Sequence, residues 1–496
     1  MPRAAAITSA LRRKGRSLPK IANTLLPSCA AALVVLAVTP IRTQTPQNPP
    51  AALYAQHCAA CHGPKLDGAA ASSLLDDDWK FGGDDASVTA SIRDGRPGTA
   101  MLPFKDILNA EQIRVLVFHI REQAGRAKGR PKTKVDPHGA IVTSGTQTVR
   151  LDVVAKNLET PWGIAFLPDG RLLITERPGR LRILDKGRLM APVTGIPEVW
   201  QVQDGGLFDI EVHPDYARAG WIYLSYSEAG PEKTSNTVII RGKLRDNAWV
   251  EPQVLFKGGP ETYNTHNFHY GSRFIFDKDG HLFYSIGDKG RVADAQDLSK
   301  PAGKIHRVND DGSVPKDNPF VGRAGVLGTI WSYGHRNPQG FAFDPRTGAM
   351  WSTEHGPRGG DELNQIERGR NYGWPLVSHG LENGITASER EGLESPVVYW
   401  TPTIAPAGIA FSGANEYPGW PNHLFVSGLG GQQLRRLEVS GSTVTKQEVV
   451  FNEYGRVRDV IVGPDGLLYV ALSLPGARTI DTTPGAIVRL VPMPSR

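Results

Sequence analysis

Two cysteines and a histidine near the N-terminus form the first group whose spacing indicates chemistry. Cys58, Cys61 and His62 follow the pattern Cys-x-x-Cys-His. At this spacing both thiols can form thioether bonds to one porphyrin, while the adjacent imidazole becomes an axial ligand of the iron. A zinc site would need two further Cys or His ligands, and a dithiol redox pair would need a βαβ context. The only other cysteine is Cys29, and no βαβ pattern flanks the motif, so the sequence predicts covalently bound haem c.

Met101 is the candidate for the second axial ligand of that haem. It lies in the irregular segment 98–104, between a predicted short helix over 51–57 and a second helix that Asn109 can cap. Apolar residues follow at helical spacing in the second helix: Ile113, Leu116, Val117 and Ile120. A thioether ligand would raise the haem potential and favour electron transfer, and a simple packing role is the alternative. Residues 50–125 resemble a class I cytochrome c domain.

The basic excess of the chain lies at its N-terminus. The formal charge is +6, but seven of the 56 Lys and Arg residues fall within residues 1–50, which contain no acid, leaving 49 bases against 50 acids. The apolar stretch 25–38 is shorter than the roughly 18–20 residues that span a bilayer. We therefore expect a signal peptide over residues 1–42 and a periplasmic protein, with an uncleaved membrane anchor as the alternative. The near-neutral remainder gives no reason to expect nucleic acid as a partner.

Residues 126–147 are predicted to be a linker, because they are basic and rich in Gly, Ser and Thr and show no periodicity. From there to residue 492 one pattern recurs: a short alternating apolar strand, usually a Pro/Asp/Gly turn, and a second apolar strand. The six units begin at Gly163, Asp209, Arg273, Gly340, Gly408 and Asp459, spaced by 46, 64, 67, 68 and 51 residues. Such spacing is typical of propeller blades.

We expect an all-β six-bladed β-propeller over 148–492, preceded by the small all-α cytochrome domain. A β-sandwich or barrel with coincidental turns is the alternative. The two ends of the repeat region, near 149–154 and 486–491, are expected to share one blade and close the ring.

Unusual polar clusters gather between about 200 and 420, where the blades are longest. They contain four candidate bases, His266, His269, His335 and His355, and a fixed cation, Arg336. A histidine oriented by a carboxylate is a good general base near neutral pH, and the arginine can stabilise an anionic oxygen. Carbonyl and carboxylate oxygens around 356–362 suit a hard cation such as Ca²⁺. Hairpin-capping histidines, or a zinc site, are the competing interpretations.

The propeller resembles the PQQ-dependent soluble aldose sugar dehydrogenases of the glucose/sorbosone dehydrogenase family over almost its whole length. The motifs that carry the resemblance are Tyr284-Ser285-Ile286-Gly287-Asp288, Gly334-His335-Arg336-Asn337-Pro338-Gln339-Gly340, Glu354-His355-Gly356-Pro357, Asp361-Glu362, Asn371-Tyr372-Gly373-Trp374-Pro375 and Arg456-Val457-Arg458-Asp459-Val460. These motifs are long and occur in order.

The resemblance implies roles for individual residues. His269 would be the base that removes the sugar hydroxyl proton and Asp288 would orient it, with hydride passing to PQQ. Arg336 and Asn337 would contact the quinone oxygens. The further cofactor contacts implied are Gln339, Thr403, Arg456 and Arg458, the two arginines facing the PQQ carboxylates.

The same resemblance implies two Ca²⁺ sites. The carbonyls of Gly356 and Pro357 would hold the ion that polarises PQQ, and Glu362 with Tyr372 would form a structural site. The chain departs from the family pattern at two places. Asp204 stands where the family commonly has Gln, with Gln203 beside it, and the segment 428–433 lacks the Lys that many members use for PQQ.

Together these features predict a quinohaemoprotein dehydrogenase that oxidises an aldose, or a related alcohol or aldehyde, and passes electrons through haem c to a downstream acceptor. That acceptor would be a soluble cytochrome or a component of a respiratory chain. Two alternatives remain: a non-catalytic carbohydrate- or protein-binding propeller joined to an electron carrier, and a Ca²⁺-dependent propeller lactonase. The haem motif and the arginine pair at 456 and 458 favour the dehydrogenase.

Overall fold

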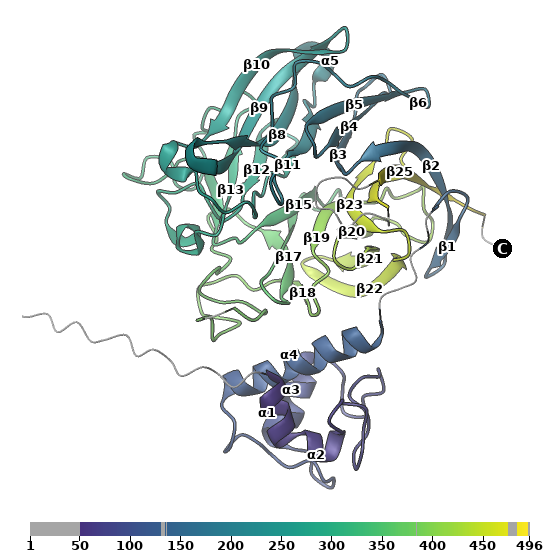
Figure 1. Ribbon diagram of the computed structural model, residues 1–496, viewed down its shortest axis with the longest axis vertical. Helices are drawn as coiled ribbons and strands as arrows, with labels where there is room; N and C mark the ends of the chain where they lie inside the picture. Colours follow the sequence, from purple (N-terminus) through teal and green to yellow (C-terminus); the bar gives the residue numbers. More distant parts are fainter. Residues whose placement is uncertain (1–49, 130–133, 135, 383, 475–483, 495–496) are drawn as a thin grey trace, which may run out of the picture. The chain divides into compact units, whose positions relative to one another are not determined.

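The computed structural model describes residues 50–129, 134, 136–382, 384–474 and 484–494 (Figure 1). The expected signal peptide and Cys29 lie outside these residues. Within the described ranges, no helix combines the length and hydropathy needed to cross a membrane.

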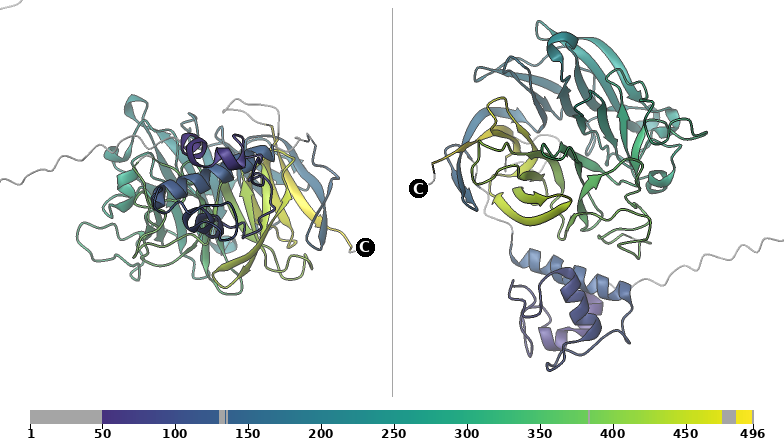
Figure 2. Two further views of the ribbon diagram at one scale, coloured as in Figure 1. Left: turned by 90° about the horizontal axis from the view of Figure 1, so that it is seen from below. Right: turned by 180° about the vertical axis from the view of Figure 1, so that it is seen from behind.

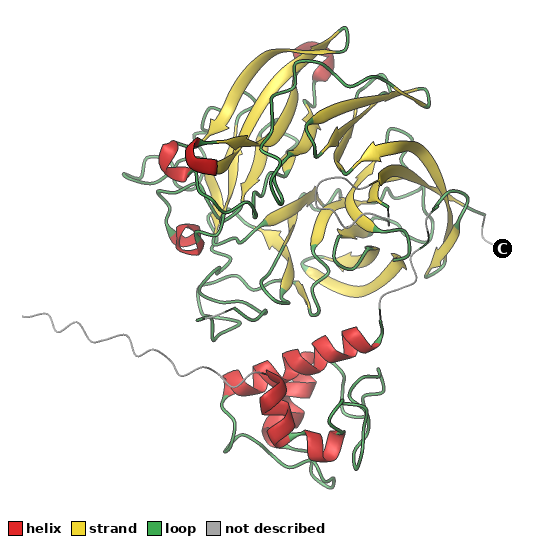
Figure 3. Cartoon of the chain, in the orientation of Figure 1, coloured by secondary structure: helices red, strands yellow, loops and turns green. Residues whose placement is uncertain are grey.

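The first described segment is helical, as the sequence predicts (Figure 3). Its helices are α1 (Pro50–His57), α2 (Ala59–His62), α3 (Asp85–Asp94) and α4 (Ala110–Ala127). Helix α4 begins with a capping box: the Asn109 side chain accepts a hydrogen bond from the Gln112 N–H at 2.9 Å, and the Gln112 side chain accepts one from the Asn109 N–H at 3.0 Å. Both predicted helices are confirmed.

Helices α1, α3 and α4 enclose one apolar core. Buried residues of all three contribute to it, among them Leu53, Tyr54, Val88, Ile113 and Leu116. Cys58 and Met101 both pack against this core as partly buried residues. The two residues predicted to attach and ligate a haem therefore border the same apolar cluster, although 43 positions separate them in the sequence.

The described residues from 141 onward form six antiparallel sheets (Figure 1 and Figure 2). Five of the sheets have four strands. The first two comprise β3 (Pro161–Phe166), β4 (Leu172–Glu176), β5 (Arg180–Asp185) and β6 (Arg188–Leu189), then β7 (Leu207–Val212), β8 (Ile222–Ala229), β9 (Ser235–Arg245) and β10 (Ala248–Lys257). The next comprises β11 (Phe274–Phe276), β12 (Leu282–Ile286), β13 (Lys304–Val308) and β14 (Ile330–Tyr333).

The remaining four-stranded sheets follow in chain order. They comprise β15 (Pro338–Phe343), β16 (Met350–Glu354), β17 (Asp361–Ile366) and β18 (Val398–Trp400), then β19 (Pro406–Phe411), β20 (Leu424–Gly428), β21 (Gln433–Ser440) and β22 (Thr443–Phe451). Short helices occupy the connections: α5 (Tyr216–Ala219), η1 (Pro231–Lys233), η2 (Pro260–Thr262) and η3 (Val292–Gln296). Strands β3, β7, β11, β15, β19 and β23 contact one another in turn and close a ring. The six-bladed propeller is confirmed.

Both ends of the propeller contribute to the sixth sheet. It comprises β23 (Arg456–Val462), β24 (Leu468–Ser473), β25 (Pro484–Pro492), β2 (Gln147–Glu159) and β1 (Ile141–Ser144). Leu151 of β2 pairs with Leu490 of β25, which confirms that the ends share a blade. Strand β1 lies inside the span expected to be linker. It forms because a turn at Gly145, where φ is +56°, folds 141–144 back onto β2.

The six repeat-initiating residues predicted from sequence surround the axis of the ring, and their side chains differ in size. Gly163 and Gly408 leave room for Asp209 and Asp459, because a Cβ on either glycine would collide with the neighbouring carboxylate. Arg273 bonds both acids, with Nη1 2.9 Å from Asp209 Oδ1 and 3.0 Å from Asp459 Oδ1. All three charged side chains are almost completely buried. A guanidinium between two carboxylates therefore joins three blades at the axis.

A cavity of about 280 Å³ lies against this network and is lined by inner-strand residues that include Glu211. Burial, together with the charge of Asp209, raises the pKa of Glu211 from 4.5 to about 8. The folded protein therefore holds a proton here that the unfolded chain releases, and stability declines as pH rises between those values.

Replacing this carboxyl by an amide removes that dependence. We expect Glu211→Gln to stabilise the protein relative to wild type, by an amount that grows from pH 5 to pH 8 at up to about 1.4 kcal/mol per pH unit. Denaturant unfolding at several pH values measures the difference. The exposed Glu198→Gln is the control, and a Glu211→Gln effect that is equal at pH 5 and pH 8 would contradict the argument.

Candidate active site

A histidine–carboxylate pair lies where two loops of one blade meet. His269 precedes strand β11 and Asp288 follows strand β12, and His269 Nδ1 lies 2.8 Å from Asp288 Oδ1. The carboxylate is completely buried and also accepts hydrogen bonds from Trp374 Nε1 at 2.8 Å and from the Gly290 N–H at 2.9 Å. With Nδ1–H directed at Asp288, the other ring nitrogen, Nε2, carries the free lone pair. The pair is built as a general base and its orienting group.

The charge of Asp288 is maintained despite its burial. Burial alone would raise its pKa, but the hydrogen bond and charge of His269, the Gly290 N–H and the charge of Arg336 together hold the pKa below its ordinary value. The carboxylate is therefore ionised at neutral pH and can accept from both His269 and Trp374. An ionised acceptor on Nδ1 also stabilises the imidazolium that forms when Nε2 takes a proton.

Arg336 lies beside the pair in the connection between β14 and β15. Its backbone carbonyl accepts from the Asp288 N–H at 2.8 Å, and its Nη1 donates to the carbonyls of Gly356 at 2.7 Å and His355 at 3.2 Å. The guanidinium carbon is 5.2 Å from the centroid of the Trp374 ring. Its buried Nε has no hydrogen-bond partner among the described residues. This unsatisfied donor beside a base indicates a place for an anionic or carbonyl oxygen.

Asn337 and Gln339 connect this arginine to the His269 loop. Asn337 Oδ1 accepts from the Gly271 N–H at 3.0 Å, and Gln339 Nε2 donates to the Gly271 carbonyl at 2.8 Å. Gln339 Oε1 in turn accepts from Arg458 Nη1 at 3.2 Å. The predicted cofactor residues at 336–339 are thus brought together with His269.

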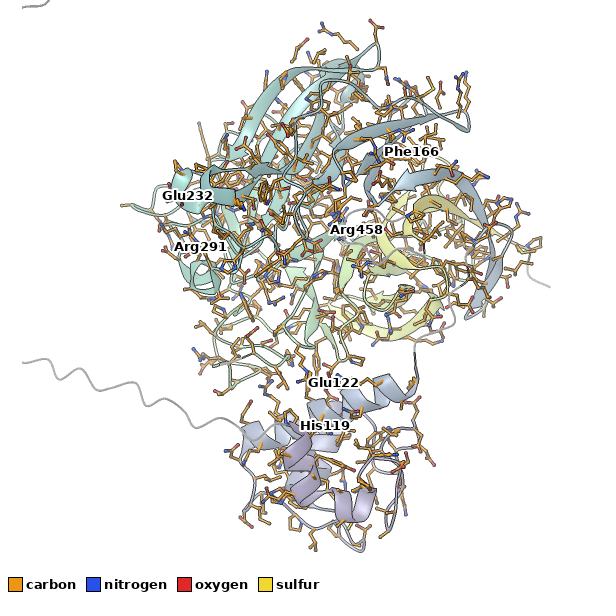
Figure 4. All side chains as sticks on the ribbon, in the orientation of Figure 1. His119, Glu122, Phe166, Glu232, Arg291 and Arg458 are labelled. Carbon is orange, nitrogen blue, oxygen red and sulfur yellow. The ribbon has the colours of Figure 1, made fainter. Side chains whose placement is uncertain are left out.

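Arg456 and Arg458 lie on β23, and Arg458 is labelled in Figure 4. Burial, with the nearby charges of Arg456 and Arg273, lowers the pKa of Arg458 to about 9. Asp204 opposes this effect, while Arg177 adds to it. The guanidinium is therefore buried, and the arginines at 456, 273 and 177 add positive charge around it. A ligand with several carboxylates would offset that charge.

Gln203 and Asp204 lie in an exposed turn near these arginines. Gln203 has a positive φ of 53°, and its carbonyl accepts a hydrogen bond from Arg177 Nη1. The Asp204 N–H donates to the Asn267 carbonyl at 3.0 Å, next to the His269 loop. The departure from the family pattern at Asp204 therefore places here a carboxylate whose charge acts on Arg456, Arg458 and Lys289. Thr403 lies in another loop, where its hydroxyl donates to Asp361 Oδ2 at 2.5 Å.

The residues proposed for Ca²⁺ fall in two places. The Gly356 carbonyl already accepts from Arg336, and Pro357 is buried beside it. Glu362 lies near Glu354, and Asn364 Nδ2 bonds both, at 3.1 and 3.2 Å. Burial and the charge of Glu354 raise the pKa of Glu362 well above its ordinary range. The Tyr372 hydroxyl instead donates to the Gln365 carbonyl at 2.6 Å.

Of the four candidate histidines, His269 alone pairs with an aspartate beside Arg336. His335 is fully buried and bonded to Ser332 Oγ and Glu354 Oε1. His355 Nε2 bonds the Pro406 carbonyl at 2.8 Å, and burial, with the charge of Arg458, lowers its pKa to about 3. His266 is exposed. The last three are structural or surface residues in this arrangement.

Three contributors to the site were not singled out from sequence. Trp374 holds Asp288 from a loop 86 positions away. Lys289 is 2% exposed, with Nζ bonded to the His266 carbonyl and 3.6 Å from the centroid of the Tyr270 ring, and burial lowers its pKa to about 7. Arg177 approaches Arg456 and Arg458 from the end of β4. The sequence signals were the place of Trp374 in the family motif at 371–375 and the position of Lys289 directly after Asp288.

The haem motif has a matching geometry. His62 Nδ1 lies 3.2 Å from the Ser72 carbonyl, which orients the ring and leaves Nε2 for a metal. Cys61 is exposed, and burial, followed by the charge of Cys61, raises the pKa of Cys58 to about 11. Cys58 and Met101 border the same apolar core. These residues fit a covalently attached haem with His and Met ligands.

Two protein families match the chain. Residues 158–480 match the family described as Glucose / Sorbosone dehydrogenase. Residues 46–120 match the family described as Cytochrome C oxidase, cbb3-type, subunit III.

Similar proteins cover the propeller. Aldose sugar dehydrogenase YliI of Escherichia coli strain K12 is 40% identical over 348 residues, covering 68% of this chain and 93% of that protein. The crystal structure of the soluble Escherichia coli aldose sugar dehydrogenase in its apo form has a TM-score of 0.65 and 39% identity, covering 70% of this chain and 100% of that one. The PQQ-bound aldose sugar dehydrogenase of Streptomyces coelicolor has a TM-score of 0.58 and 28% identity, covering 73% and 100%.

Proposed function

The chain belongs to the glucose/sorbosone dehydrogenase family and carries an N-terminal cytochrome c domain, and from this premise we propose that it is a PQQ-dependent quinohaemoprotein that oxidises an aldose or a related alcohol or aldehyde. The observation that carries the proposal is the His269–Asp288 pair beside Arg336, whose buried Nε lacks a partner among the described residues. A base and a fixed cation at one site suit removal of a hydroxyl proton coupled to hydride loss.

The residues present fit PQQ. The unsatisfied Arg336 Nε and the positive charge at Arg456 and Arg458 match a group that has quinone oxygens and several carboxylates. When bound, PQQ supplies the acceptor for the hydride. His269 Nε2 removes the hydroxyl proton and Asp288 holds the ring and stabilises its charged form. Asn337 and Gln339, which both hydrogen-bond to the main chain of Gly271, fix the position of Arg336 relative to the His269 loop.

We also propose that the protein binds Ca²⁺, mainly through main-chain carbonyl oxygens. No cluster of three or more Cys, His, Asp or Glu side chains in the described ranges has the arrangement of a metal site. A hard cation would therefore rely on the Gly356 and Pro357 carbonyls, and a second one on Glu362 with main-chain oxygen near Tyr372. A cation near Glu362 would also allow that buried carboxyl to ionise.

Haem c completes the electron path. Cys58 and Cys61 would attach the porphyrin, and His62 and Met101 would ligate the iron. Each substrate molecule loses two electrons and two protons, and a haem accepts one electron at a time. The haem must therefore pass an electron to a downstream carrier between transfers, and we place this chemistry in the periplasm because of the basic and apolar N-terminal segment.

A substrate panel tests the proposal. Purified protein carrying haem is mixed with PQQ, Ca²⁺ and each of a series of aldoses, alcohols and aldehydes, and the haem absorbance is followed. We expect at least one aldose to reduce the haem only when PQQ is present. Haem that stays oxidised with every substrate, together with no reduction of a small soluble dye, would contradict the assignment. Substrate hydrolysis without PQQ would favour the lactonase instead.

A further inference from the structure

Helix α4 of the cytochrome domain contacts propeller loops through hydrogen bonds and an ion pair. Arg114 is held by Glu111, with Nε 2.7 Å from Oε2, and its Nη1 donates to the Gly380 carbonyl at 3.1 Å and the Ser378 carbonyl at 3.3 Å. Glu111, on the same helix, therefore orients the Arg114 guanidinium toward the propeller carbonyls. The Ser378 and Gly380 carbonyls accept charge-assisted hydrogen bonds from this guanidinium, and such bonds are stronger than those between neutral groups.

Two helical turns further along, Glu122 forms a forked ion pair with Arg358 of the propeller. Arg358 Nε and Nη2 lie 3.1 and 2.5 Å from the two carboxylate oxygens (Glu122 is labelled in Figure 4). The Glu122 side chain is only 10% exposed. Burial would raise the pKa of Glu122, but the bond and charge of Arg358 hold it below the ordinary value. The carboxylate is therefore buried as an anion, and Arg358 is its main counter-charge.

Apolar packing lies between these two polar contacts. Phe118 is 5% exposed and packs on Gly359, where a Cβ would collide with the ring. The Arg358 guanidinium carbon is 5.6 Å from the centroid of the same ring. A third polar contact joins Tyr399 to Asp85 of α3, with the hydroxyl 2.6 Å from Oδ2. The contact surface thus has an aromatic centre and a polar rim, the anatomy of a specific interface.

The propeller side of this interface is also a wall of the candidate active site. Gly356, two residues before Arg358, accepts the hydrogen bond from Arg336. Ser378, whose carbonyl receives Arg114, lines a small cavity together with Arg336, Gly356 and Trp374. The 356–360 segment therefore contacts the predicted quinone site on one side and Phe118 and Glu122 on the other.

We infer that the cytochrome domain receives electrons while docked through α4 on the 356–360 and 378–380 segments, rather than by free diffusion on its linker. The inference rests on the proposed function for the source of the electrons. Each substrate oxidised delivers two electrons and releases two protons to solvent. Cys58, Cys61, His62 and Met101 would hold a haem that takes these two electrons one at a time, and an external one-electron carrier would remove each of them in turn. Specificity for this acceptor then lies in Arg358, Glu122 and Arg114.

Charge reversal tests the docking. In the full-length protein carrying haem, PQQ and Ca²⁺, Arg358→Glu places two carboxylates in contact and should open the interface. We expect the rate of sugar-driven haem reduction, followed by stopped flow, to fall at least about ten-fold. Turnover with a small soluble dye as acceptor should remain at the wild-type level. The double variant Arg358→Glu/Glu122→Arg restores an ion pair, but Arg126, whose Nη2 lies 3.0 Å from Glu122 Oε1, would repel the new arginine, so we expect recovery of part of the haem reduction rate.

Two further measurements keep the outcomes separate. Arg188→Glu, an exposed arginine on β6 of another blade, is the matched control and should change neither rate. Small-angle scattering of full-length protein without PQQ should show a compact particle for wild type and the double variant, and an extended one for Arg358→Glu. Unchanged haem reduction in Arg358→Glu, or an extended wild-type particle, overturns the docking inference. Absence of dye reduction by wild type overturns the proposed function instead.

Discussion

Replacing His269 by alanine should lower sugar-dependent turnover by about 10³-fold, within the range of about 10² to 10⁴ that general-base catalysis contributes. The reason is the geometry around the imidazole: Asp288 fixes Nδ1, so Nε2 is the one ring nitrogen positioned to take a proton. Alanine removes that acceptor and leaves a buried carboxylate that still accepts from Trp374. The loss should appear in kcat rather than in PQQ affinity, because the arginines proposed to contact the cofactor are untouched.

Steady-state turnover with a soluble dye measures this loss, and the haem absorbance spectrum checks that the cytochrome domain is intact. His266→Ala is the matched control, since His266 lies three positions away and is exposed. The control should keep nearly full activity. A His269→Ala protein that retains turnover within about ten-fold of wild type would remove His269 from the role of base.

Arg273→Met should lower the free energy of unfolding by about 3–5 kcal/mol, the cost of breaking a buried ion pair from one side. The side chain is 5% exposed and bonds Asp209, Asp459 and, through Nε, the Gln339 carbonyl at 2.8 Å. Methionine fills similar space but leaves two buried carboxylates facing each other with no cation. Denaturant unfolding of the purified protein gives the free-energy difference.

The pH dependence of this effect identifies its cause. Burial already raises the pKa of Asp209 and Asp459, and removal of Arg273 takes away the charge that opposes that rise. The destabilisation should therefore shrink at acidic pH, where both carboxyls are protonated. Combining Arg273→Met with Asp209→Asn and Asp459→Asn should recover part of the stability at neutral pH. A cost that is independent of pH would indicate lost packing instead of unpaired charge.

The repeat pattern predicted the propeller well because each unit is a local hairpin. The starting residues of the six units, such as Gly163 and Arg273, identified inner strands correctly. The shared closing blade was predicted because apolar strands remained at both ends of the repeat region. The helices of the cytochrome domain were also predictable from local sequence, because the Asn109 cap and the apolar stripe of α4 both lie within a few turns of one helix. Strand β1 was missed because it is short and its pairing depends on the turn at Gly145.

The site was harder to predict where contacts are distant in sequence. By residue type and spacing alone, four histidines were equivalent candidate bases, and only the family resemblance distinguished His269 from the other three. Trp374 meets Asp288 from a separate loop, and Arg358 meets Glu122 across 236 positions. No spacing rule relates such pairs, because their distance is set by how blades and domains pack. The family motifs contained most of the predicted cofactor residues and Trp374, but they did not indicate that Trp374 contacts Asp288, and they did not include Arg358 or Glu122.

The closing blade also determines the order in which the molecule can assemble. Every other blade is complete once one contiguous stretch of chain has been made, whereas β2 must wait for β25, the last of the described strands in chain order. The cytochrome helices precede β2 and depend on local contacts, so they can form early. Until β25 arrives, β2 and β24 each present an unpaired edge, the type of surface that recruits other chains. Strand β25 therefore covers both of these edges when it pairs with β2 and β24.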